Sequence, residues 1–282
     1  MNIWQADFYH LPSPAGQDRQ WELVICQSGI VVSDSYKEQI IHTAQCFSAD
    51  ANADWVEKQI LLAANGKLPE IIQIFRPQSL GLITTASSKL GIKVEATRNT
   101  DVLKQVLTQR HKNIPNYNPL ALDKPPPQAL PESIWGDQWQ IANIAAGQIV
   151  ELFGDRPIPI RSLPESLTPI NLGISSNIPI PGIVVYGGRK SMQLARWIDR
   201  QVPAFVNYIP TEVGQSGGFI LETGLVDRWI FNTFESAQAA SIAKAYEQKK
   251  LASKGLHFLL IQPDDSGMTT TAFWLLREYR QL

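Results

Sequence analysis

The sequence is poor in cysteine and has no long hydrophobic stretch. Two cysteines, Cys26 and Cys46, occur among 282 residues. They are too few for the disulfide framework of a small secreted protein, so we interpret both as buried free thiols. No uninterrupted apolar run approaches the length of a membrane-spanning helix, and the first residues show neither a signal nor a transit pattern. We therefore expect a cytoplasmic protein that does not insert into a membrane.

An excess of charge of either sign is also absent. The chain has 25 Lys and Arg against 26 Asp and Glu, which gives a net charge of −1. Any nucleic acid must therefore bind to a local basic patch, because the overall charge offers no attraction. Hydrophobic residues make up 44% of the chain and charged residues 18%, values typical of a globular protein with a substantial core.

Recognisable catalytic motifs are missing as well. The chain contains no Walker A loop and no GxGxxG stretch, and its four histidines are scattered without metal-ligand spacing. One of them, His257, begins an apolar strand, and we interpret it as a satisfied core or edge residue rather than a general base. We therefore expect no catalytic residues, no bound metal and no cofactor.

Prolines are concentrated between residues 113 and 131 and divide the chain. Proline cannot donate a backbone hydrogen bond and disrupts the interior of a helix. We therefore interpret 113–131 as a linker, or as an extended strap lying on the second domain. The sequence thus predicts an α/β protein with two mixed α/β domains, an N-terminal one at 1–112 and a C-terminal one at 132–282.

Apolar periodicity in the first domain predicts three strands followed by alternating helices and strands. The expected elements are strands Ile3–His10 and Trp21–Gln27, a third strand beginning at Gly29–Ser33, helix Asp54–Asn65, strand Ile71–Phe75, helix Ser79–Leu90, strand Ile92–Thr97 and helix Asp101–Arg110. Gly66 follows the first helix as a C-cap candidate. This order resembles the ribonuclease H-like arrangement, an analogy that carries no function by itself.

The second domain has the same mixed pattern. The expected strands are Ile183–Tyr186, Ala204–Ile209, Phe219–Thr223, Arg228–Phe234 and His257–Gln262, and the expected helices are Lys190–Arg200 and Glu235–Ser253. After the last of these strands, a Pro-Asp-Asp-Ser-Gly turn leads into a second apolar strand at Ala272–Leu276.

An active ribonuclease H-type nuclease would need several carboxylates around two divalent metal ions. Asp7 and Glu57 are candidates, but Arg76 places a cation where a further carboxylate is needed. We therefore interpret Asp7 and Glu57 as solvated surface charges. Asp264 and Asp265 could form another carboxylate pair, but we favour turn chemistry, because Asp bonds nearby backbone N–H groups in such turns.

The best candidate site for an RNA backbone is Pro181–Ser191, where a strand runs through Gly187 and Gly188 into a helix. Free N–H groups at a helix start attract anions, and glycine lets a phosphate approach the backbone closely. Arg189 and Lys190 lie at the same positive helix end, where cations are unfavourable unless an anion is present.

Further basic and aromatic residues extend this candidate RNA site. Along the helix, Arg189, Gln193, Arg196 and Arg200 recur at i, i+4, i+7 and i+11, which stacks three arginines in one stripe. Other candidates for phosphate contact or base stacking are Trp197, Arg228, Trp229, Lys249, Lys250 and Lys254. Purely structural roles are the alternative, since lysines complement a helix C-terminus and tryptophans commonly pack in cores.

Several longer motifs occur in order along nearly the whole chain. They are Trp4–Tyr9, Trp21–Leu23, Phe75–Gln78, Trp135–Trp139, Arg156–Ile160, Ile183–Arg189, Leu225–Ile230 and the stretch from Lys254 to Leu276. In these motifs the chain resembles the plant, algal and cyanobacterial family of Tab-type RNA-binding proteins. Chloroplast members of that family are linked to translation of the photosystem I B-subunit messenger.

The resemblance implies a non-enzymatic RNA-binding factor that binds an A/U-rich messenger leader and acts in translation or expression of photosystem subunits. It implies single-stranded messenger RNA as partner, with translation or photosystem assembly proteins as further candidates. The lack of a transit pattern favours a cyanobacterial-like member acting in the cytoplasm. The tail Arg277–Leu282 continues past Trp274–Leu276, at which such proteins commonly end.

Two other functions stay open at this point. A protein-interaction or assembly factor for photosystem biogenesis, without direct RNA binding, would dock through the aromatic-rich C-terminus and the proline segment. The near-neutral net charge favours it over general RNA affinity. A metal-dependent nuclease would use Asp7 and Glu57, or Asp264 and Asp265, and Arg76 disfavours the first of these pairs.

Overall fold

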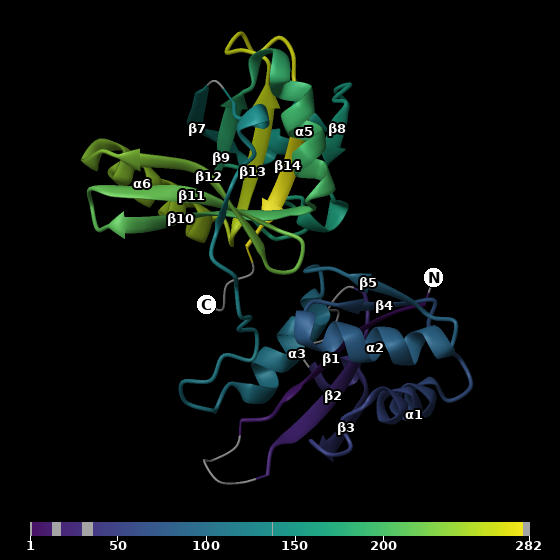
Figure 1. The fold of residues 1–282 in the computed structure, drawn as a ribbon. Helices are drawn as coiled ribbons and strands as arrows, with labels where there is room; N and C mark the ends of the chain where they lie inside the picture. Colours follow the sequence, from purple (N-terminus) through teal and green to yellow (C-terminus); the bar gives the residue numbers. More distant parts are fainter. Residues whose placement is uncertain (1, 13–17, 30–35, 137, 279–282) are drawn as a thin grey trace. The chain divides into compact units, whose positions relative to one another are not determined.

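The computed structural model describes residues 2–12, 18–29, 36–136 and 138–278 (Figure 1). The chain divides into two compact units, Met1–Asp123 and Lys124–Leu282. In the described residues these units contain three mixed β-sheets and six α-helices. The predicted α/β fold class is therefore confirmed.

The first unit contains one five-stranded sheet. Its elements are β1 (Ile3–His10), β2 (Gln20–Gln27), the 3-10 helix η1 (Tyr36–Gln39), β3 (Ile40–Phe47), α1 (Ala53–Ala64), β4 (Ile71–Ile74), α2 (Pro77–Lys89), β5 (Lys93–Ala96) and α3 (Asp101–His111). The strand order is β3-β2-β1-β4-β5, with β1 antiparallel to β2 and parallel to β4. The ribonuclease H-like interpretation of this order stays a prediction.

The third strand of this sheet differs from the expected one. The strand predicted at Gly29–Ser33 falls mostly on residues 30–33, which lie outside the described residues. The strand that pairs with β2 is β3, which the sequence analysis missed. Because β3 is a half-exposed edge strand, its hydrophobic alternation is weak.

Local signals fix the ends of the first two helices. The side chain of Asn52 caps α1 by accepting a hydrogen bond from the Trp55 N–H at 2.9 Å. The helix ends at Asn65, which has a left-handed φ of 44°, and Gly66 continues the turn with a φ of 89°. Pro77 begins α2, where its missing N–H costs no helical hydrogen bond.

The two faces of β1 pack against different helices. Trp4, Ala6 and Phe8 belong to one buried cluster, which includes residues of α1 and α2. Tyr9 belongs to another, which includes four residues of α3. The period of two along a strand therefore places the sheet between two helical layers, as Figure 1 shows.

Both cysteines are free thiols on this sheet. Cys26 is buried, as predicted, and burial raises the pKa of its thiol to about 12. Cys46 is only half-buried on the edge strand. A protonated, enclosed thiol such as Cys26 is a packing residue rather than a nucleophile.

The second unit contains two sheets. Its strands and α-helices are β6 (Gln128–Ala129), β7 (Gln138–Ala145), α4 (Ile149–Phe153), β8 (Ile160–Ser162), β9 (Pro179–Tyr186), α5 (Ser191–Arg200), β10 (Pro203–Glu212), β11 (Ser216–Thr223), β12 (Asp227–Glu235), α6 (Ala237–Ala252), β13 (Leu256–Gln262) and β14 (Ala272–Arg277). Short 3-10 helices are η2 (Glu132–Ile134), η3 (Ala146–Gln148), η4 (Glu165–Leu167) and η5 (Gly188–Lys190). The sheet orders are β7-β9-β13-β14-β8 and β10-β11-β12-β6.

The five-stranded sheet of this unit is buried on both faces. Ile183 and Leu259 lie in a cluster that also holds residues of α5, α6 and the four-stranded sheet. Val184 and Phe258 lie in a second cluster, which holds residues of α4. This burial explains the nearly continuous apolar runs that predicted β9 and β13 from the sequence.

The proline-rich segment 113–131 spans the boundary between the two units at residue 123, and each of its two parts contacts the unit to which it belongs. In the first unit, Arg76 donates to the carbonyls of Pro119 and Ala121 at 2.7 and 3.1 Å. In the second unit, β6 pairs in parallel with β12, and Leu130 enters the core. The segment is therefore held along much of its length.

The sequence analysis missed β6, β7, β8 and α4. A period of two was present in β7, where half-buried Trp139 and Ile141 alternate with exposed Gln138 and Gln140. The others have two to five residues, too few for any periodicity to show. Across the described residues, none of the helices combines the length and the hydropathy needed to cross a membrane.

Candidate nucleic-acid interface

The turn before α5 uses its glycine amides within the protein. The N–H of Gly187 donates to the carbonyl of Gln262 at 2.9 Å, and the N–H of Gly188 donates to that of Pro263 at 3.0 Å. These two amides are therefore not free for a phosphate, which corrects the predicted anion cradle. Glycine is needed here for packing, since a Cβ at position 187 would lie 2.7 Å from the Cα of Ser191.

The turn and helix α5 nevertheless present a row of cations. Arg189, Lys190, Arg196 and Arg200 are all exposed, as the predicted spacing requires, while Leu194 is buried against the sheet. In the described part of the chain, none of these four cations has a hydrogen bond or ion pair through its side chain. Arg189 and Lys190 lie at the positive end of α5, where unpaired cations are unfavourable for the free protein and attract anions, whereas Arg200 lies in the last turn, where a cation is favourable.

The two tryptophans predicted to stack on bases pack on each other instead. The rings of Trp197 and Trp229 meet edge to face with centroids 4.9 Å apart, and both are half-buried against the core. The indole N–H of Trp229 donates to Thr223 Oγ1 at 3.0 Å. Their geometry supports packing of α5 on β12, which was the alternative interpretation.

Arg228 is occupied by a buried carboxylate. Its Nε lies 3.2 Å from Glu222 Oε1, and one terminal nitrogen donates to the carbonyl of Pro125 at 3.3 Å. Lys124 contacts the same carboxylate at 3.3 Å. Since Glu222 is almost fully buried, the two cations offset the cost of removing its charge from water.

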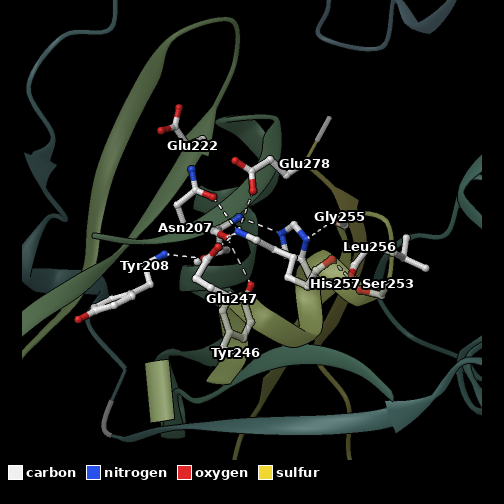
Figure 2. A network of polar contacts seen from close by, with 12 residues as sticks. Asn207, Tyr208, Glu222, Tyr246, Glu247, Ser253, Gly255, Leu256, His257 and Glu278 are labelled. Carbon is white, nitrogen blue, oxygen red and sulfur yellow. Dashed lines mark hydrogen bonds and ion pairs between the residues drawn. The ribbon is translucent and has the colours of Figure 1, made fainter. Parts of the chain in front are cut away.

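Lys250 on α6 is a buried structural residue. Its side chain has no exposed surface, and its Nζ contacts the Val206 carbonyl at 2.8 Å, Asn207 Oδ1 at 2.7 Å, Glu247 Oε1 at 2.8 Å and Glu278 Oε2 at 3.0 Å. Figure 2 shows the side chains of Asn207, Glu247 and Glu278 pointing toward one another. The predicted RNA contact at Lys250 is therefore wrong, because its ammonium is enclosed by the protein.

The other two lysines of this helix end differ in their surroundings. Lys249 is half-buried. Lys254 is exposed, but its Nζ donates to the carbonyls of Leu172 and Gly173 at 2.8 and 3.1 Å. We therefore do not retain Lys254 as a phosphate contact.

The beginning of the C-terminal tail is integrated into the same network. Glu278 contacts Lys250, and its N–H donates to the carbonyl of Gly255 at 3.0 Å. His257 is buried beside it, accepting from the Val206 N–H through Nε2 and donating to Gly255 through Nδ1 (Figure 2). The prediction that His257 is a satisfied core residue is confirmed, while residues 279–282 lie outside the described part of the chain.

Asp7 is neutralised in the way the sequence indicated. The Nε of Arg76 contacts both carboxylate oxygens of Asp7, at 2.9 and 3.0 Å, and Ser79 Oγ donates to one of them at 3.2 Å. Asp7 is fully buried, which corrects its interpretation as a solvated surface charge. Burial raises the pKa of Asp7, and the bond to Arg76 opposes that effect. A metal ion would have to displace this guanidinium.

The other candidate carboxylates have ordinary roles. Glu57 forms an ion pair with Lys89 at 3.0 Å on the surface of the first unit. Asp264 accepts from the hydroxyl of Ser266 and from its backbone N–H, the latter at 3.0 Å, which confirms the predicted turn chemistry. The hydroxyl bond first, and then the backbone bond, lower the pKa of Asp264. Among the described residues, no three His, Cys, Asp or Glu side chains are grouped so that they could hold a metal ion.

The sequence analysis missed a pocket in the second unit. Its walls include Trp135 and Trp139, the two ends of one of the motifs quoted above. Two tryptophans flanking a glycine were a signal for it, since aromatic side chains commonly line ligand pockets.

Family models match almost the entire chain. Residues 3–110 match the N-terminal region of the RNA-binding protein Tab2/Atab2, and residues 117–277 match its C-terminal domain. The chain is 28% identical over 290 residues to the chloroplastic protein TAB2 homolog of Arabidopsis thaliana, covering 97% of this chain and 74% of that protein. For the chloroplastic protein TAB2 homolog of Zea mays, the identity is 26% over 289 residues, covering 97% and 70%.

Solved structures offer only weak likenesses. A simian T-cell lymphotropic virus intasome in complex with a PP2A regulatory subunit matches with a TM-score of 0.23 and 15% identity, covering 41% of this chain and 43% of that one. The HTLV-2 integrase catalytic core domain in complex with magnesium matches with a TM-score of 0.24 and 14% identity, covering 42% of this chain and 76% of that one. Likeness at this level supports no argument about fold or chemistry.

Proposed function

The chain belongs to the Tab2/Atab2 family of RNA-binding proteins, and on that premise we propose that it is a non-enzymatic factor that holds single-stranded RNA on its second unit. Arg189, Lys190, Arg196 and Arg200 bind the phosphates. The observation behind this proposal is that these four cations are exposed and unpaired among the described residues, whereas Lys250, Lys254 and Arg228 are engaged within the protein.

We further propose that the RNA is an A/U-rich messenger leader and that binding serves the expression of photosystem subunits. The support is the resemblance in the motifs quoted above, together with two plant relatives named as TAB2 homologs. A cytoplasmic location belongs to the same proposal, although both relatives are named as chloroplastic. Translation or photosystem assembly proteins would be the further partners.

The test is RNA binding across a salt series. For single-stranded RNA, each phosphate contact contributes about 0.7 to the slope of log affinity against log salt. The triple variant Arg189→Ala/Arg196→Ala/Arg200→Ala should therefore lower the slope by about 2 and weaken binding most at low salt. Fluorescence anisotropy with a labelled photosystem-gene leader measures both quantities.

A matched control removes three exposed lysines from the first unit. The variant Lys58→Ala/Lys67→Ala/Lys93→Ala changes the net charge equally and should leave the slope near the wild-type value. Equal losses in both triple variants would mean that only overall charge matters. An absence of RNA binding by the wild type would reject the proposal and favour an assembly factor that binds proteins.

A further inference from the structure

A pocket of about 200 Å³ lies in the second unit beside helix α5. Its walls come from several elements: Trp135 precedes β7, Trp139 lies on β7, Leu194 lies on α5, and Phe231 lies on β12. Most of these side chains also pack on the main core of the unit. Much of the wall is therefore built on strands and a helix, while Trp135 enters from the segment between η2 and β7.

The size and lining of this pocket suit one flat ring system. Sites for drug-sized ligands begin at roughly 300 Å³, so a volume near 200 Å³ accepts a smaller group. Trp135 is 54% exposed, and its indole N–H is fixed by a 3.1 Å bond to the carbonyl of Leu130. A large aromatic ring that is held at its edge and open to solvent is a suitable stacking surface.

A polar group without a partner also lies in the pocket wall. Among the described residues, Nδ2 of Asn232 is buried and has no hydrogen-bond acceptor. This nitrogen has less than 1 Å² of accessible surface, so an acceptor in the pocket reaches it only when the side chain turns. An unpaired buried donor is unfavourable for the free protein and favours such a bond. Exposed Gln138 and Thr233 add hydrogen-bonding groups to the same wall. Nucleobases combine an aromatic face with acceptors along their edges.

The pocket and the cations share helix α5, on different faces of it. Leu194 lies five residues after Arg189 and six before Arg200. At a rise of about 1.5 Å per residue, each cation is within about 10 Å of Leu194 along the helix axis. Leu194 faces the core, whereas Arg196 and Arg200 lie on the exposed face, so the strand has to pass beside α5 for a phosphate next to the bound base to meet these side chains.

We propose that this pocket receives an unpaired nucleobase of the bound RNA, stacked on Trp135 and hydrogen-bonded by Asn232. The inference rests on the proposed RNA-binding function. It adds recognition of a base, which distinguishes RNA from a polyanion without bases. The cations of α5 then hold the backbone, and the pocket holds a base.

The experiment compares oligoadenylate and oligouridylate with an abasic oligonucleotide of equal length and charge. Wild-type protein should bind at least one base-containing strand about tenfold more tightly than the abasic strand. Trp135→Ala should abolish that preference and leave the salt slope unchanged, while Trp135→Phe should retain most of it. Phe47→Ala, which removes a ring that is 51% exposed in the first unit, should have no effect.

Asn232→Leu gives a second measurement that does not depend on a damaged fold. It removes an unpaired buried donor, so the free protein should be at least as stable as wild type, yet base-dependent binding should fall several-fold. Equal affinity of the wild type for base-containing and abasic strands would reject the pocket and leave the α5 interface standing. A preference that survives Trp135→Ala would also reject it. An absence of binding to every strand would reject both proposals.

Discussion

Helices α5 and α6 of the second unit look alike in the sequence, because each is accompanied by a cluster of basic residues. Around α5, Arg189, Arg196 and Arg200 are exposed and unpaired among the described residues. On α6, Lys250 is enclosed by four oxygens and has no exposed surface. A basic side chain thus supports the fold on α6, whereas the arginines near α5 are exposed and without a partner among the described residues.

The difference follows from which face of the helix each residue occupies. Lys250 lies seven residues after Ala243 and four after Tyr246, so all three share the buried face of α6. On α5, the arginines lie opposite Leu194 and Ile198, which are buried. A basic residue on an apolar stripe must find acceptors inside the protein, whereas one off that stripe stays solvated.

The largest expected effect is on stability, from Lys250→Met. The substitution keeps most of the side-chain volume but leaves Glu247 and Glu278 without their shared cation. Removing one member of a buried ion pair costs about 3–5 kcal/mol, and we expect a loss in the free energy of unfolding in that range. Urea denaturation followed by tryptophan fluorescence measures it.

Lys244→Met on the exposed face of α6 is the matched control and should change the free energy of unfolding by less than about 0.5 kcal/mol. Equal small effects of the two variants would mean that the contacts of Lys250 contribute nothing net. The contrast between α5 and α6 would then lose its energetic basis.

The next effect concerns Gly255, which lies between α6 and β13 and accepts a hydrogen bond from the N–H of Glu278 in the tail. Gly255 has a φ of 82°, and a Cβ there would lie 2.0 Å from the carbonyl oxygen of Glu278. Gly255→Ala should therefore cost about 2 kcal/mol or more, from left-handed strain plus the collision. Gly267 has a similar φ of 70° with open space around it, so Gly267→Ala should cost only about 1 kcal/mol. Thermal unfolding measures the loss of stability in each variant. Equal losses would mean that the tail does not pack on Gly255.

The sequence predicted what depends on local pattern. The predicted bounds of β1 are those of the structure, because its alternating apolar residues begin after Asn2 and end at His10. The exposure of Arg189, Arg196 and Arg200 followed from helical spacing alone. The burial of Lys250 was missed, although its spacing to Ala243 and Tyr246 on one helix face indicates it.

The sequence analysis missed contacts between residues that are far apart in the chain. The amides of Gly187 and Gly188 looked free at a helix start, but the end of β13, about 75 residues later, supplies their acceptors. Asp7 looked like a surface charge, but Arg76 and the segment around Pro119 cover it. Such partners are set by the order of strands in a sheet, which periodicity does not specify.

A smaller effect is expected on the pH dependence of stability. It tests whether the first unit, like α6, contains charged groups that are enclosed by the protein. Tyr9 donates to Glu22 at 2.5 Å, and Arg110 contacts the same carboxylate at 2.6 Å. His111 lies 2.9 Å from the Tyr9 hydroxyl, and burial lowers its pKa, with Glu22 opposing and Arg110 adding to the shift. The folded state therefore disfavours the protonated imidazole relative to the unfolded chain.

The sign of this effect follows from the depressed pKa of His111. Its contribution to stability is full above the unfolded pKa of about 6.5 and is lost as the pH falls below that value towards the folded pKa. The unfolding free energy should thus decline between pH 7 and pH 5, and His111→Gln should reduce the decline. An unchanged slope in that variant would assign the decline to other groups, His10 among them, whose pKa burial also lowers.

The smallest expected effect is the most informative about α5. If Arg189, Arg196 and Arg200 contribute nothing to the fold, replacing all three with alanine should change the unfolding free energy by no more than about 0.5 kcal/mol. Low salt should if anything favour the variant, because three unpaired like charges have been removed and alanine is the better helix former. A loss above about 1 kcal/mol would show that the arginines support α5 as Lys250 supports α6. In that case, weaker RNA binding by the same variant would report a damaged helix. A neutral result lets the binding experiment report contact with RNA alone.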